Sequence, residues 1–180
     1  MKKVIKIFSL IGISLVLAGC DSVLSNTTDT SKNMAGNCNY LDCINKISET
    51  ASVEDINNII GIDGQLTDKQ YNKYEWSFNE EISLYATYYS NGNPTITIDY
   101  YDEDIMNKKV DLSDLDTLKT KVKAGMTYDE FKQHLGNVEG TLIEKSKYTK
   151  KYIWMDNSGG YVKGTFNSKN ECTYFSGITK

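Results

Sequence analysis

Thiols, one imidazole and carboxylates are the side chains with which this sequence could do covalent or metal chemistry. The chain of 180 residues has four cysteines, one histidine and 24 acidic residues, and all 20 of its basic residues are lysines. A cysteine nucleophile needs a base within hydrogen-bond reach, and no spacing places a cysteine beside His134. A single histidine also leaves too few ligands for a histidine-rich zinc site. We therefore expect no cysteine–histidine catalysis, no metal and no other cofactor.

Carboxylates gather near the middle of the chain, at Asp99, Asp102, Glu103 and Asp104. Clusters of oxygen ligands can bind calcium, but the glycine and the distal glutamate of an EF-hand loop are missing at the required offsets. We interpret the cluster as a solvated acidic turn. The absence of arginine excludes bidentate recognition of phosphate or guanine, and a formal net charge of −4 is atypical of nucleic-acid binding.

The first twenty residues carry the most specific pattern. Three lysines precede an apolar stretch over residues 7–17, and the sequence then reads Leu17-Ala18-Gly19-Cys20. This order predicts a secretory signal peptide over residues 1–19, because the apolar stretch is too short to span a membrane stably. The ending resembles the lipobox of bacterial lipoproteins. The alternatives are an ordinary signal peptide and a membrane-anchored N-terminus with an incidental cysteine.

The lipobox resemblance implies where the protein is located. In that family the cysteine receives a diacylglyceryl group and the peptidase cuts before it, so Cys20 is the expected lipidation site. Two or three acyl chains, such as palmitate, anchor a protein stably. We expect a lipid-anchored protein on the extracytoplasmic face of the cell membrane, and the composition suggests a Gram-positive host. Residues 20–37 are polar and predict a disordered tether, the alternative being an arm packed on the domain.

An extracytoplasmic location permits disulfide bonds. Cys38 and Cys43 are five positions apart, and a chain that folds back before a helix can join them. The alternative is a buried, inert thiol at Cys43. Cys172 falls in the last predicted strand, and we expect it to be free.

The rest of the sequence repeats itself with a period of roughly 75 residues. Aligning Gly61 with Gly136 brings Trp76 opposite Trp154, after small gaps. The two tryptophans of the chain therefore occupy equivalent places, most simply in the core. We expect a first repeat unit over residues 38–101, a linker over 102–114 and a second unit over 115–180.

Each unit has the same predicted elements. Ser52 can cap a helix that Gly61 ends, and Thr127 with Glu130 matches a capping box. Another helix precedes each of these, and strand-like segments follow them at 65–70, 74–78, 82–89, 95–101, 141–146, 150–155, 161–166 and 171–178. The expected fold class is α+β, with two tandem helix-turn-helix plus four-stranded antiparallel sheet units.

A family resemblance rests on Gly125-Met126-Thr127-Tyr128-Asp129-Glu130-Phe131, Leu135-Gly136 and Tyr152-Ile153-Trp154. A secreted or lipid-anchored tandem of this unit resembles the β-lactamase-inhibitor-protein family, whose single-unit relatives include a small outer-membrane assembly lipoprotein. The resemblance implies two sheets that form a concave surface with helices behind it, and it implies protein binding more than catalysis. In the inhibitors an acidic residue on a hairpin of the first unit enters the enzyme's site. The comparable tip here holds Glu80 and Glu81.

Tyrosine, with 13 copies, suggests the contact surface. Strand alternation separates two faces, and we expect Tyr85, Tyr89 and Ile98 to face the helices because their aligned partners are apolar. The opposite face is then expected to display Leu84, Ala86, Tyr88, Thr97, Tyr101, Tyr161, Lys163 and Tyr174. Open-face tyrosines are typical of interfaces, although β-propensity alone also places tyrosine in strands. The expected contact residues are Tyr88, Tyr101, Tyr161, Lys163 and Tyr174, with Glu80 and Glu81.

Charge divides the two units. Residues 38–113 hold 14 acids and 5 lysines, whereas residues 114–180 hold 8 acids and 11 lysines. Such a dipole can steer an oppositely polarised partner, or the two units can simply attract each other. We interpret the chain as a non-catalytic, lipid-anchored binding protein whose partner is an unidentified envelope or secreted protein, with no nucleic acid. The alternatives are an envelope enzyme or polymer binder acting on wall glycans or peptides, and a spacer without a specific partner.

Overall fold

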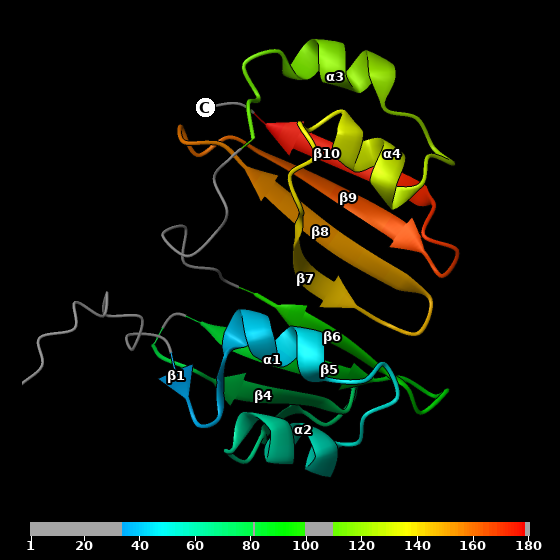
Figure 1. Cartoon of the computed structure of the whole chain (residues 1–180). Coiled ribbons are helices and arrows are strands. Elements are labelled where there is room, and N and C mark those ends of the chain that lie inside the picture. The colour runs from blue at the N-terminus through cyan, green and yellow to red at the C-terminus, as the bar shows by residue number, and fades with distance from the viewer. Residues whose placement is uncertain (1–33, 81, 100–109, 179–180) are drawn as a thin grey trace, which may run out of the picture. The chain divides into compact units, whose positions relative to one another are not determined.

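One antiparallel sheet dominates the computed structural model, which describes residues 34–80, 82–99 and 110–178 (Figure 1). We refer to residues 34–99 as the first half and to residues 110–178 as the second half. Several predictions lie outside the described residues: the signal peptide over 1–19, the lipidation site Cys20, the tether as far as residue 33, the contact residues Glu81 and Tyr101, and linker residues 102–109.

The sheet runs in the order β10-β9-β8-β7-β6-β5-β4-β3, and every neighbouring pair is antiparallel. Its strands are β3 (Gln65–Asp68), β4 (Lys73–Ser77), β5 (Ser83–Tyr88), β6 (Pro94–Ile98), β7 (Thr141–Lys145), β8 (Thr149–Met155), β9 (Tyr161–Asn167) and β10 (Cys172–Ile178). A separate two-stranded ladder pairs β1 (Met34–Ala35) with β2 (Cys38–Asn39). Sequential strands therefore pair with each other throughout.

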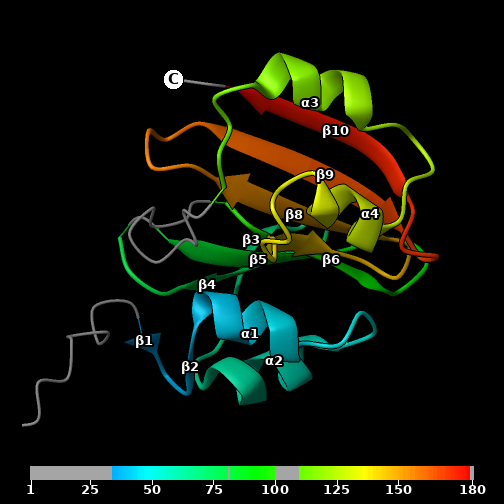
Figure 2. The same cartoon turned by 45° about the horizontal axis from the view of Figure 1, so that its top comes forward.

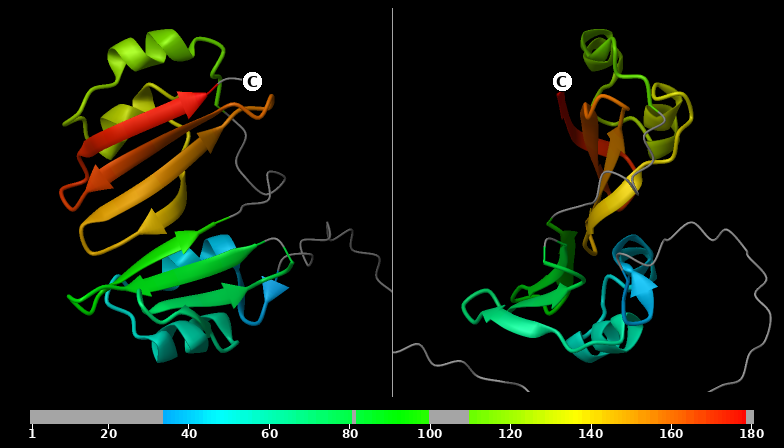
Figure 3. Two further views of the ribbon diagram at one scale, coloured as in Figure 1. Left: turned by 180° about the vertical axis from the view of Figure 1, so that it is seen from behind. Right: turned by 90° about the vertical axis from the view of Figure 1, so that its left-hand side faces the viewer.

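The described part of the chain has four short helices: α1 (Tyr40–Lys46), α2 (Val53–Ile60), α3 (Leu115–Lys121) and α4 (Tyr128–Gln133). In each half, two helices precede four strands. Figures 2 and 3 show α1 and α4 on the same side of the sheet, and we call the other side the helix-free face.

The expected fold class is wrong. The structure is largely β, because each helix has only six to eight residues and a single eight-stranded sheet replaces the two separate sheets. The sheets merge where β6 pairs with β7, with Ile96 opposite Lys145 and Thr97 opposite Glu144. Local periodicity identifies strands, but it carries no information on which edge strands meet.

Side-chain caps fix the starts of α2 and α4. The Ser52 hydroxyl accepts from the Asp55 amide and the Asp55 carboxylate accepts from the Ser52 amide. Thr127 and Glu130 form the same reciprocal pair. These bonds satisfy amides that lack an intrahelical partner. Gly61 ends α2 with φ +86°, a left-handed conformation that glycine adopts at low cost.

Each half has an apolar core between its helices and the sheet. In the first half Ile44 and Ile56 pack with Trp76 and Leu84, all of which are fully buried. In the second half Phe131 of α4 lies 5.1 Å from Trp154, between ring centroids, and packs edge-to-face on Phe166. The two tryptophans are thus core residues, as expected.

Lys145 forms hydrogen bonds between the two halves on the helix side. This β7 residue is only 4% exposed, and its ammonium donates to the carbonyl oxygens of Ile47 and Asn45 at the end of α1. Burial lowers the pKa of Lys145, with Glu49 opposing that shift. A cation there suits the negative end of the helix, so α1 of the first half is capped by a strand of the second.

Candidate functional site

The helix-free face carries a row of polar side chains that crosses all eight strands. The strand registers place one residue of each strand side by side: Gln65, Glu75, Tyr85, Thr97, Glu144, Lys151, Thr165 and Tyr174. We call these residues the polar row. Neighbouring strands lie about 4.8 Å apart, so the row presents amide, hydroxyl and charged groups at regular intervals.

A bulge in β7 brings two successive side chains to this face. The register shifts between Leu142 and Glu144, which makes Ile143 the extra residue of the strand. Leu142 packs in the core and Lys145 reaches α1, whereas Ile143 and Glu144 both line a hollow on the helix-free face. Bulges commonly re-aim side chains beside functional sites.

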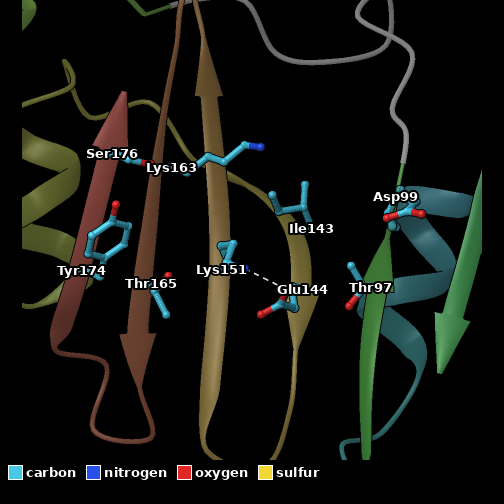
Figure 4. A pocket seen from close by; sticks show the side chains of 10 residues that line it. Thr97, Asp99, Ile143, Glu144, Lys151, Lys163, Thr165, Tyr174 and Ser176 are labelled. Carbon is cyan, nitrogen blue, oxygen red and sulfur yellow. Dashed lines mark hydrogen bonds and ion pairs between the residues drawn. The ribbon is translucent and has the colours of Figure 1, made fainter. Parts of the chain in front are cut away.

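That hollow has a volume of about 340 Å³ and extends over β6 to β10 (Figure 4). One side consists of polar-row residues, namely Thr97, Glu144, Lys151, Thr165 and Tyr174. In Figure 4, Asp99, Ile143, Lys163 and Ser176 lie on the other side, and the core residue Ile98 also lines the hollow. This volume lies within the range of sites that bind small ligands or short segments of a partner.

Charges in the hollow are ordered along the strand sequence. Asp99 is exposed at the end of β6, while Lys163 belongs to β9 and extends across β8 in Figure 4. Between them, the Lys151 ammonium donates to Glu144 at 2.8 Å. The Lys163 ammonium also lies 4.9 Å from the centre of the Tyr161 ring. The hollow is therefore acidic at one end, basic at the other, and internally neutralised in between.

A second polar group lies along the same face on β4 and β5. Glu75 accepts hydrogen bonds from the hydroxyls of Ser83 at 2.7 Å and Tyr85 at 3.2 Å. The Lys73 ammonium lies 3.8 Å from the centre of the Tyr85 ring. Burial, together with the neighbouring Glu75 charge, raises the pKa of Tyr85, so its hydroxyl stays protonated and keeps donating. These contacts stiffen the polar row where it leaves the hollow.

Three of the predicted contact residues lie together on the helix-free face. Lys163 and Tyr174 line the hollow, and Tyr161 lies beside Lys163. Tyr174 is 66% exposed, which is the largest exposure of any large hydrophobic side chain in the described part of the chain. Glu80 is exposed at the turn between β4 and β5 and does not line the hollow.

The placement of Tyr88 on the contact face is wrong. Its hydroxyl donates to the Ala51 carbonyl oxygen at 3.0 Å, and its ring packs on the first-half core. Burial raises the pKa of Tyr88 to about 12. Leu84 and Ala86 are also buried on the helix side, whereas Tyr85 belongs to the polar row. The sequence alignment placed β5 one residue out of register, and a slip of one exchanges the faces of a strand.

Cys38 and Cys43 form a disulfide in the structure, as expected, and the alternative of a buried free thiol at Cys43 is wrong. Cys172 is free and buried in the second-half core, and burial raises the pKa of its thiol. His134 is exposed at the end of α4. Within residues 34–80, 82–99 and 110–178, no cluster of three or more His, Cys, Asp or Glu side chains could hold a metal ion.

Sequence reasoning missed most of the hollow. Thr165 and Ser176 alternate with residues that the sequence places in the core, so strand alternation could have found them. Ile143 and Glu144 share a face only because of the bulge, which leaves no mark in the alternation. Asp99 was interpreted only as a member of the acidic turn.

No protein-family model matches the sequence, and no curated protein matches it. Among the described residues, no helix is long and apolar enough to cross a membrane.

Proposed function

We propose that this chain is a lipid-anchored, extracytoplasmic binding protein that holds a partner on the helix-free face of its sheet. The partner is an envelope or secreted protein, and the anchor is the lipid on Cys20. The observation that supports this proposal is the hollow, which charged and hydroxyl side chains from five strands line and which ends at the exposed ring of Tyr174 on β10.

Two features favour recognition over catalysis. The Glu144 carboxylate and the Lys151 ammonium form an ion pair at 2.8 Å, which places an acceptor and a donor side by side for a partner to contact. Tyr174 combines a large ring with one polar group, which is typical of residues that dominate binding energy. The polar row continues beyond the hollow as far as β3, which offers a partner an extended surface.

Differential capture tests this function. The chain from residue 20 onward, with Cys20→Ser to prevent lipidation, is immobilised and exposed to host envelope extract. We expect Tyr174→Ser to weaken capture of a specific partner roughly tenfold, because tyrosine rings that a partner covers are typically worth more than 1 kcal/mol. Tyr71→Ser is the matched control, since Tyr71 is 55% exposed but lies in the turn between β3 and β4. Equal capture by both variants would contradict the proposed face.

A further inference from the structure

The turns at one end of the sheet share one composition. Strand register brings four turns to this end, and Figures 1 and 3 show that those after β5, β7 and β9 project in the same direction. We call these four turns the basic end of the sheet. They are residues 69–72 between β3 and β4, 89–93 between β5 and β6, 146–148 between β7 and β8, and 168–171 between β9 and β10.

Lysine and exposed tyrosine are concentrated at the basic end. Of the five large hydrophobic side chains that are exposed in the described part of the chain, three are tyrosines of these turns, each with more than half of its surface exposed. Three exposed lysines lie in the same turns, and the Lys147 ammonium is 5.9 Å from the centre of the Tyr148 ring. The tyrosines are Tyr71, Tyr89 and Tyr148, and the lysines are Lys69, Lys147 and Lys169.

The opposite end of the sheet has the reverse composition. Its turns hold Glu80 and Asp156, and Asp99 follows β6, whereas residues 78–82 and 156–160 contain no lysine and no tyrosine. Strand β8 has seven residues and is about 23 Å long, and the Debye length at physiological salt is about 8 Å. The negative charge of the far end is therefore largely screened at the basic end, and the sheet is polarised along its strands.

The acidic residues that border the basic end are partly engaged by neighbouring groups. Glu171, the only acid within the four turns, accepts from the Asn167 side-chain amide at 3.0 Å. Asp68 accepts from two backbone amides of the turn that follows it. The exposed acids Glu54 and Asp129 lie in the first turns of α2 and α4, on the helix side. An anionic surface is therefore expected to approach these turns from the helix-free side.

We propose that the basic end contacts the surface of an anionic lipid bilayer, with its lysines at the headgroup phosphates and its tyrosine rings in the interfacial layer. Tyrosine is enriched where proteins meet this layer, because its ring is apolar while its hydroxyl can stay in contact with water. Lysines close to an anionic bilayer are attracted to its surface charge. The proposal rests on the proposed function for proximity, since the lipid on Cys20 holds the sheet near a bilayer.

The arrangement of the tyrosines favours a membrane over a soluble anionic polymer. Each of the three rings lies on a separate turn, and a fluid headgroup layer can close around each of them. A soluble polyanion attracts the lysines equally well, but it has no interfacial layer that takes up the rings. Binding that requires both the lysines and the tyrosines is therefore the signature of a bilayer.

Vesicle binding tests the proposal on the chain from residue 20 carrying Cys20→Ser, so that no lipid is attached. In co-sedimentation we expect binding to mixed phosphatidylglycerol and phosphatidylcholine vesicles, little binding to phosphatidylcholine alone, and weaker binding as salt rises. Lys147→Gln with Lys169→Gln should weaken binding about 25-fold, because each lysine near an anionic surface contributes roughly fivefold. Lys119→Gln with Lys121→Gln changes two exposed lysines of α3 and is the matched control, which should change binding less than about twofold.

The tyrosines are tested together. Tyr71→Ser, Tyr89→Ser and Tyr148→Ser in one chain should weaken vesicle binding about tenfold, because the rings lose their contact with lipid. Binding of soluble poly(glycerol phosphate) should be weaker and unaffected by these changes. Spin-labelled lipid gives a readout that needs no variant: the amide NMR signals of Tyr89 and Tyr148 should broaden, whereas those of Glu80 and Asp156 should not.

Three results would overturn the proposal: no binding to phosphatidylglycerol vesicles, a lysine double variant that binds like its control, or equal and tyrosine-independent binding of the soluble polymer. Broadening at Glu80 and Asp156 in place of the tyrosines would also overturn it. Any of these results leaves the proposed function standing if Tyr174→Ser still weakens capture of a protein partner. Conversely, vesicle binding through the basic end without any Tyr174-dependent capture would contradict the proposed function and retain the membrane surface.

Discussion

The same contact between a glycine and a tryptophan occurs once in each half. A Cβ atom on Gly64 would lie 2.5 Å from the Trp76 indole, and one on Gly140 would lie 2.5 Å from the Trp154 indole. The hydrogen bonds around the two contacts differ. Asn57 accepts from both the Gly64 amide and Trp76. In the second half Tyr128 accepts from the Gly140 amide, and the Val138 carbonyl oxygen accepts from Trp154. What the two halves share is therefore the close approach of a glycine backbone to a tryptophan ring, which leaves no room for a Cβ atom.

This constraint predicts that the effects of substitutions at Gly140 and Trp154 on the free energy of unfolding are not additive. Gly140→Ala should lower the free energy of unfolding by about 2 kcal/mol, because the added methyl group overlaps a buried ring that cannot move freely. Trp154→Phe removes the ring atoms that the methyl group meets. In that background the same alanine should cost markedly less, which chemical denaturation of the four proteins measures as a coupling energy. Strictly additive effects would show that the ring contact does not require glycine.

At the scale of elements, the helices depend on their first turns. The hydrogen bonds from Ser52 lower the pKa of Asp55, and those from Thr127 lower the pKa of Glu130. Helices of six to eight residues are too short to be stable alone, so these caps and the packing beneath them determine whether the helices form. Both carboxylates also lie at the positive ends of helix dipoles, where a negative charge is favourable.

The caps predict a pH dependence. Because the folded-state pKa of each carboxyl is depressed, the folded state binds fewer protons than the unfolded chain, and the stabilisation is complete above about pH 4 to 4.5. It is lost as the pH falls through the folded-state pKa values. Asp55→Asn combined with Glu130→Gln should therefore be less stable than the unmodified chain at pH 7 and approach it at pH 2. Glu54→Gln with Asp129→Asn changes neighbouring acids of the same turns and is the control in these thermal unfolding scans.

For the whole molecule, the decisive feature is the junction of the two halves. Only two register pairs join β6 to β7, and the buried ammonium of Lys145 adds the bonds to the end of α1. Lys150 forms an ion pair with Glu49 nearby, at 3.6 Å and partly exposed to solvent. The halves therefore share one sheet and one helix cap, which favours cooperative unfolding.

Lys145→Met tests the junction. Loss of the donor leaves buried carbonyl oxygens unsatisfied and should lower the free energy of unfolding by about 2 kcal/mol. Lys150→Met removes only the partly exposed ion pair and should cost less than about 0.5 kcal/mol. Since burial lowers the pKa of Lys145, the folded state releases this proton at lower pH than the unfolded chain. The advantage of the unmodified chain over Lys145→Met should therefore grow as the pH rises toward about 10.5. A constant difference would contradict this account.

Local chemistry was predictable from the sequence, whereas strand register and sheet continuity were not. Three predictions were correct: the caps at Ser52 and Thr127, the end of α2 at Gly61, and the burial of the two tryptophans. The caps and the helix end depend on residues only a few positions apart, and large aromatic side chains at equivalent places of a repeat are usually buried. The face of Tyr88 was wrong because a single alignment gap reverses a strand. The pairing of β6 with β7 and the bulge at Ile143 depend on contacts between distant segments, so residue patterns alone did not predict the hollow.

The disulfide near the start of the described chain also determines how the fold bears mechanical load. Tension applied from the N-terminal side first peels β1 from β2 and then arrives at Cys38. The covalent bond to Cys43 bypasses residues 39–42 and transmits the force directly into α1, which is anchored in the core. The intervening residues cannot lengthen while the bond is intact. We expect that under reducing conditions a pull from the N-terminal side unravels the first turn of α1 at lower force, because residues 39–42 can then lengthen.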